Sequence, residues 1–166
     1  MTKKLKIVVL AKQVPDTRNV GKNAMTPEGT VNRAALPAIF NPEDMNALEQ
    51  ALFIKDQNPG SEVLLLTMGP FRAADVIREG LFRGADGGVL LTDRKFAGAD
   101  TLATSYALSL GIEKLGGADL IVCGKMAVDG DTAQIAPELA QHLGIPHVSD
   151  VCEILEMAED HLVVRR

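Results

Sequence analysis

Residues 119–134 read DLIVCGKMAVDGDTAQ, and this stretch decides the fold of the chain. Its first part, Asp119–Cys123, is typical of a fully buried parallel strand. Its second part, Gly124–Gln134, is polar and leads into a helix. Open α/β sheets bind ligands in loops at the carboxyl ends of their strands. Because amides at a helix start also suit phosphate groups, the sequence predicts a nucleotide-binding loop over Gly124–Gln134.

Strands and helices alternate along the rest of the chain. Apolar runs predict three further buried strands, at Leu5–Ala11, Glu62–Met68 and Gly88–Thr92. Three helices are expected: one that starts at Asn41-Pro42-Glu43-Asp44 with Asn41 as N-cap, one over about Ala73–Gly84, and one from a cap at Asp100 toward Gly116-Gly117. Strands that are apolar on both faces and alternate with helices predict an open, mainly parallel α/β sheet with helices on both faces.

The remaining segments contain residues that limit regular structure. Lys12–Ala38 is expected to be irregular because Pro and Gly recur in it. Pro137 is tolerated only in a first helical turn, so the helix after the loop cannot begin much before Ala133. Val148–Met157 and Leu162–Val164 are typical of two short strands, which predicts a C-terminal antiparallel β-hairpin at the sheet edge.

The composition narrows the class of protein. With 166 residues, 46% of them hydrophobic, the chain suits a single domain over residues 1–166. A net charge of −5 and a pI near 5.2 argue against nucleic acid or an anionic membrane surface as the main partner. No apolar run approaches the ~20 residues of a membrane span, and no signal peptide is evident. Two cysteines are too few for a disulfide framework, Cys123 is expected to be an inert buried thiol, and a cytoplasmic location is expected.

Several familiar catalytic and nucleotide-binding motifs are absent. Gly124-Lys125 lacks the earlier Gly and the following Ser/Thr of a Walker A loop. The turn Ala11–Asp16 contains no glycine, so it is neither a dinucleotide fingerprint nor the serine- and glycine-rich loop of ATP pyrophosphatases. No Ser/His/Asp or Cys/His arrangement is visible, and we assign neither a catalytic residue nor a metal site.

The polar residues near the strand ends are candidates for binding. Asp129 and Asp131 can cap a turn or a helix, accept ribose hydroxyls, or, less commonly, hold a metal. Lys125 and Lys12 are either solvated loop lysines or partners of a phosphate or flavin. Residues 93–101, DRKFAGADT, form a polar loop after another strand and are expected to be a second wall of the site.

Five segments together resemble the β subunit of electron-transfer flavoproteins. They are Val8–Thr17, Asn41–Asp44, Met68-Gly69-Pro70, Gly84-Ala85-Asp86 and Gly124–Gln134, in the order and at the spacing of that family. The resemblance covers nearly all of residues 5–150. It implies an adenine-nucleotide α/β fold (adenine nucleotide alpha hydrolase-like) and a heterodimer with an electron-transfer flavoprotein α subunit.

The resemblance also implies a ligand. In ordinary members the β subunit holds AMP as a structural ligand, and that site maps onto Leu10, Asn41, Met68 and the Gly124–Gln134 loop. In electron-bifurcating members a second FAD takes the AMP position. Val128–Gln134 and Asp93–Ser105 resemble the bifurcating group. Ordinary members have a bulkier acidic residue where Gly130 stands, so Gly130 and Ala133 are expected to give a flavin room.

FAD is therefore the expected cofactor, with AMP in the same site as the alternative. The diphosphate is expected to bind the backbone amides of the loop that begins at Gly124, namely those of Gly130, Asp131, Thr132, Ala133 and Gln134. Asp129 and Asp131 are expected to shape the loop or to bind ribose, and Thr101 and Thr104 to contact the flavin ring or ribitol. Lys12, Lys125 and Arg94 are expected near the diphosphate or the ring.

By the same resemblance, electrons would come from NADH and divide between ferredoxin or flavodoxin and, through the α-subunit FAD, an acyl-CoA dehydrogenase. Family β subunits run well beyond residue 166 and embrace the α subunit with the later chain. We therefore expect either a fragment that lacks this arm or a variant that binds its partner differently. Three alternatives stay open: a non-bifurcating subunit with AMP, a stand-alone adenine-nucleotide-binding regulatory protein, and an enzyme that cleaves an α–β phosphate bond.

Overall fold

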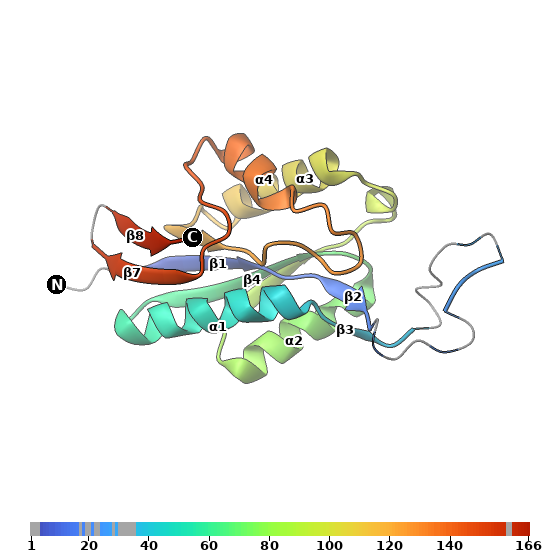
Figure 1. The fold of residues 1–166 in the computed structure, drawn as a ribbon, viewed down its shortest axis with the longest axis horizontal. Coiled ribbons are helices and arrows are strands. Elements are labelled where there is room, and N and C mark those ends of the chain that lie inside the picture. Colours follow the sequence, from blue (N-terminus) through green and yellow to red (C-terminus); the bar gives the residue numbers. More distant parts are fainter. Residues whose placement is uncertain are drawn as a thin grey trace.

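The centre of the structure is a four-stranded parallel sheet in the order β5-β4-β1-β6. This computed structural model describes residues 4–16, 18, 21, 24–27, 29, 36–158 and 161–166. The sheet strands are β1 (Lys6–Leu10), β4 (Glu62–Met68), β5 (Gly87–Leu91) and β6 (Leu120–Val122). Helices α1 (Pro42–Gln57) and α2 (Ala74–Arg83) cover one face, and α3 (Thr101–Lys114) and α4 (Ile135–Leu143) cover the other (Figure 1). The predicted fold class is confirmed.

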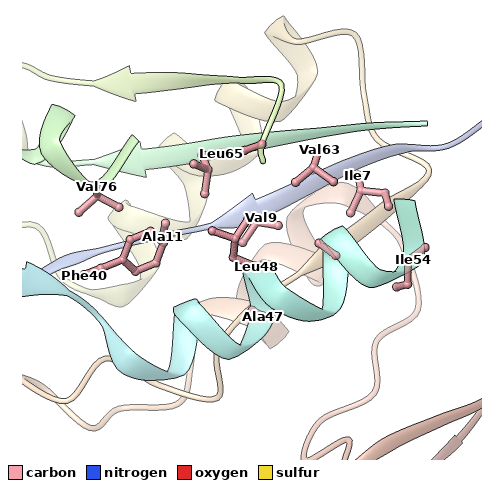
Figure 2. Close-up of a cluster of buried hydrophobic side chains, with 12 residues drawn as sticks. Ile7, Val9, Ala11, Phe40, Ala47, Leu48, Ile54, Val63, Leu65 and Val76 are labelled. Carbon is pink, nitrogen blue, oxygen red and sulfur yellow. The ribbon is translucent and has the colours of Figure 1, made fainter. Parts of the chain in front are cut away.

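The alternation of side chains along β1 explains this three-layer arrangement. Ile7 and Val9 belong to a core cluster with α1 and α2, whereas Val8 and Leu10 belong to a second cluster with α3 and α4. Figure 2 shows the first cluster, with Leu48 of α1 packed among the strand side chains. Burial of each such side chain contributes roughly 1.5–3 kcal/mol, so a strand that is apolar on both faces is stable only between two helix layers.

The helix boundaries follow their local signals. Asp100 caps α3, because its side chain accepts a hydrogen bond from the Ala103 amide at 2.8 Å. Helix α4 begins at Ile135, so Pro137 stands in its first turn as predicted. Short 3-10 helices, η1 (Phe71–Ala73) and η2 (Arg94–Phe96), follow β4 and β5.

Two expectations about the smaller elements were wrong. The segment expected to be irregular contributes β2 (Gln13–Pro15), which pairs antiparallel with β3 (Ala38–Phe40). The C-terminal hairpin is present as β7 (Glu153–Met157) and β8 (Leu162–Arg165), but it forms a sheet of its own rather than an edge of the main sheet. Residues 148–152 precede β7, and of these the Cys152 amide donates to the Arg165 carbonyl of β8 at 2.8 Å.

The strand order reverses beside β1, and we call the space between the loops that follow β1 and β6 the crevice. From β1 the chain moves outward to β4 and then β5, and it returns to add β6 on the other side of β1. The carboxyl ends of β1 and β6 therefore flank the point where the strand order reverses, which is where open α/β sheets bind ligands. The hairpin lies at the opposite end, near the amino ends of the strands (Figure 1).

Candidate nucleotide-binding site

An ion pair joins the two sides of the crevice. Lys12 follows β1, and its Nζ lies 2.7 Å from Oδ1 of Asp129 in the loop after β6. The Asp129 side chain is only 6% exposed, while that of Lys12 is 47% exposed. The structure thus brings together two residues that the sequence assigned to the site separately. The Asp129 carboxylate is paired with a cation from the facing strand end, a contact that the sequence analysis did not predict.

Asn41 holds the loop instead of capping the helix. It stands at the N-cap of α1, but its side chain makes no cap hydrogen bond. Its Nδ2 donates to the Met126 carbonyl at 2.9 Å, and its Oδ1 accepts from the Val128 amide at 3.2 Å. Asn41 is fully buried. The expectation that the Asn41 side chain caps α1 was wrong, because its amide nitrogen and oxygen both bind the loop backbone instead.

Two acidic residues in the first turn of α1 also bind this part of the chain. Asp44 Oδ2 accepts from the Lys12 amide at 2.9 Å, and its carboxylate also accepts from the Gly124 backbone. Glu43 Oε2 accepts from the Met126 amide at 3.0 Å. Sequence reasoning treated both acids only as partners of the helix dipole and missed this role. One signal in the sequence could have indicated it: Asn41–Asp44 and Gly124–Gln134 are both among the five segments that resemble the family.

Burial dominates the electrostatics of Asp44. Removal from water raises the pKa of this carboxyl to about 6, although hydrogen bonds from Asn41, Lys12 and Gly124 lower it. Burial, together with the nearby Asp44 carboxylate, also raises the pKa of the Cys123 thiol to about 12. This thiol is protonated at neutral pH, in agreement with the inert cysteine expected from the sequence.

The two glycines of the loop have different surroundings. A Cβ on Gly124 would lie 2.4 Å from Oδ1 of Asp44 and 2.7 Å from the backbone of Glu43 and Asp44. Gly124 is therefore required by the close approach of the loop to α1. A Cβ on Gly130 would meet no heavy atom within 4 Å. The space beside Gly130 is open.

Residues 130–134 form the exposed part of the loop. The amides of Gly130 and Asp131 both donate to the Ala127 carbonyl, at 3.1 and 2.9 Å, which closes a turn. Asp131 and Ala133 have left-handed backbone conformations, with φ of 50° and 53°. Side chains other than Gly, Asn and Asp adopt this region rarely, so Ala133 is a strained position. The chain then enters α4 after Gln134.

The second predicted wall is linked to the loop through α4. Thr101, at the start of α3, donates its hydroxyl hydrogen to Glu138 Oε1 at 3.0 Å, and Ser105 donates to the other oxygen at 3.3 Å. Thr104 lies in the same first turn of α3. Arg94 is exposed in η2, after the outermost strand β5. The structure thus joins Thr101 to the helix that follows the loop, and it leaves Arg94 at the far side of the sheet edge.

The other candidates take mainly structural positions. The side chain of Leu10 is buried in the core below α3 and α4, and Met68 at the end of β4 packs against the same cluster. Lys125 lies 2.7 Å from Asp150, a contact that raises the pKa of Lys125 and ties the loop to the segment before the hairpin. Its charge is therefore shared with a carboxylate.

Residues 28–166 match the electron transfer flavoprotein domain. The chain belongs to the electron transfer flavoprotein family. The predicted resemblance to its β subunits is confirmed, because the chain is 50% identical to the electron transfer flavoprotein subunit beta of Clostridium acetobutylicum over 162 residues, 98% of this chain and 61% of that protein.

Two further relatives carry names of reductase systems. The caffeyl-CoA reductase-Etf complex subunit CarD of Acetobacterium woodii is 49% identical over 98% of this chain and 61% of its own length. The acryloyl-CoA reductase electron transfer subunit gamma of Anaerotignum propionicum is 52% identical over 87% of this chain and 54% of its own length. This chain thus spans between 54% and 61% of the length of these curated relatives. Within its described residues, no helix is both long and apolar enough to cross a membrane.

Proposed function

We propose that this chain is the nucleotide-binding part of an electron transfer flavoprotein β subunit, and that the crevice between β1 and β6 binds FAD. The open space at Gly130 is the observation that carries the proposal. FAD has a diphosphate and a second, bulky half where AMP ends in one phosphate. A side chain at Gly130 would project into this space beside the exposed residues 130–134.

The residues present fit such a ligand. The amides of Gly130 and Asp131 already donate to the Ala127 carbonyl, which leaves the backbone amides of residues 132–134 for the ligand. These lie just before α4, where the positive end of the helix dipole favours a diphosphate. Lys12, half-exposed at the facing strand end, would shift its charge from Asp129 toward a bound diphosphate. Asp131 is exposed, and its carboxylate accepts hydrogen bonds from ribose hydroxyls. The Thr101 hydroxyl donates to Glu138, and its oxygen can still accept a hydrogen bond from the ligand. Lys125 and Thr104 complete the proposed surroundings, whereas Arg94, after the outermost strand β5, lies too far along the sheet edge to join them.

Bound FAD would supply hydride and electron transfer, while this chain supplies orientation and electrostatics. We further propose a heterodimer with an α subunit, NADH as donor, and ferredoxin or flavodoxin together with an acyl-CoA dehydrogenase as acceptors, in the cytoplasm. Relatives named as parts of caffeyl-CoA and acryloyl-CoA reductase systems support a partner that acts on a CoA thioester.

The first test is the flavin content of the complex. The chain is purified with its α subunit, and the extracted nucleotides are quantified together with the absorbance spectrum. Two FAD molecules per pair support the bifurcating type. One FAD and one AMP per pair would instead favour the non-bifurcating alternative and overturn the FAD assignment.

The second test uses Gly130→Glu. Its side chain enters open space, so the folded protein tolerates it, but it occupies the volume proposed for the second half of FAD. We expect FAD affinity to fall at least about tenfold, the effect of roughly 1.4 kcal/mol. AMP affinity serves as the internal control and should change little. Equal losses for FAD and AMP would contradict the steric role of Gly130.

A further inference from the structure

The first turn of α1 binds alternate residues of the loop backbone. Asp44 binds Gly124, Glu43 binds the Met126 amide, and Asn41 binds both the Met126 carbonyl and the Val128 amide. Successive loop residues thus contact helix residues of decreasing number, from Asp44 back to Asn41. Residues 124–128 are therefore fastened to the helix, and the exposed residues 130–134 begin where these contacts end.

The β1–β6 ladder stops short of the crevice. Its last residue pair is Val9 with Val122, whereas on the other side of β1 the ladder to β4 continues to Leu10 with Leu66. Beyond Val9 and Val122, the buried carboxylate of Asp44 bridges the two strand ends. It accepts from the Lys12 amide on one side and from the Gly124 backbone on the other.

We propose that Asp44 is a positioning residue for the ligand site, whose buried carboxylate sets the spacing between the two walls of the crevice. The inference rests on the proposed function for the identity of the ligand. Asp44 is 8% exposed and lies behind the loop, so it acts through Lys12 and Gly124 and not by touching the ligand. Correct spacing would also bring Lys12 within reach of Asp129, which it meets at 2.7 Å.

The test compares Asp44→Asn with Ile54→Ala. The side-chain amide that Asp44→Asn introduces has nearly the shape of the carboxylate but offers one oxygen acceptor, so one backbone donor loses its partner. Ile54 is a buried residue of the same helix, 4% exposed, that packs in the core and not on the loop. Its truncation lowers global stability and leaves the contacts between loop and helix intact. Asp44→Ser, which retains a shorter acceptor, replaces Asp44→Asn if that variant does not fold.

Two readouts are taken on the full chain: hydrogen exchange of the amides of residues 124–131, relative to those of β1, and the dissociation constant of FAD. For Asp44→Asn we expect exchange of the loop amides to quicken by about tenfold or more and FAD affinity to fall by a similar factor, in line with the loss of one hydrogen bond to a charged group. For Ile54→Ala both quantities should stay within about twofold of the wild type.

Unchanged loop exchange in Asp44→Asn overturns the proposal, and so does equal loosening of the loop in both variants. Loop exchange is measured without ligand, so it decides the role of Asp44 by itself. If the wild-type chain binds neither FAD nor AMP, the proposed function fails. In that case the exchange comparison still supports or overturns the positioning role.

Discussion

Substitution of Gly124 by Ala tests whether the loop touches α1 as closely as the structure shows. A Cβ at this position would lie 2.4 Å from Oδ1 of Asp44, 2.7 Å from the Asp44 amide nitrogen and 2.7 Å from the Glu43 carbonyl carbon. Two of these atoms belong to the helix backbone, which cannot rotate away. Overpacking of this kind costs about 1–3 kcal/mol, and retreat of the loop would also weaken the hydrogen bond to Asp44, worth about 1.5–3 kcal/mol. We therefore expect Gly124→Ala to lower the free energy of unfolding by about 3 kcal/mol.

Gly130→Ala is the matched control. Its Cβ meets no atom within 4 Å, and Gly130 does not have the positive φ that would strain an alanine. The substitution should leave the free energy of unfolding unchanged or raise it by up to about 1 kcal/mol, because alanine has less freedom in the unfolded chain. Urea titrations followed by far-UV circular dichroism measure both variants. Equal stability of the two variants would refute the close contact between the loop and α1.

Three further predictions concern single groups near the site. The pKa of Asp44 is raised from 3.8 to about 6, so the folded protein keeps a proton that the unfolded chain releases as the pH rises between these values. The free energy of unfolding therefore loses about 2 kcal/mol from pH 4 to pH 7 through this group. Urea titrations at a series of pH values should show the free energy of unfolding of the wild type falling by about this much more than that of Asp44→Asn over the same range. Ala133→Gly should raise the free energy of unfolding by about 1 kcal/mol because it relieves the left-handed φ of 53°, and thermal unfolding that shows a loss would contradict that conformation. Alkylation of the native protein at pH 8 should label the exposed Cys152 and spare Cys123, whose pKa is about 12, as peptide mass spectrometry would reveal.

The strands and helices of the main sheet were predictable because each has a local cause. Buried strands such as β4 are continuous apolar runs, and the start of α3 follows from the capping preference of Asp100. The pairing of β2 with β3 was not predictable in the same way. Each strand has only three residues, and their partners are about two dozen positions apart in the chain, so no local periodicity marks them.

The site was predictable in position but not in the division of its roles. The loop after β6 follows from the pattern of an open α/β sheet. Asn41, however, looks the same in sequence whether its amide caps its own helix or binds a distant loop, and tertiary contact decides for the loop. Asp44 likewise resembles any acid in a first helical turn. Only the arrival of Lys12 and Gly124 from other elements makes it a buried acceptor.

The same reasoning separates the two halves of the loop by the effects that substitutions should have. In the fastened half, residues 124–128, a substitution changes contacts with α1, so stability and ligand affinity should fall together. In the exposed half, residues 130–134, side chains have few neighbours, so a substitution such as Gly130→Glu should change affinity with little change in stability. The glycines at 124 and 130 thus have different structural roles, although they stand only six residues apart in the same loop. At Gly124 a missing side chain lets the protein pack against itself, and at Gly130 it leaves space for something else.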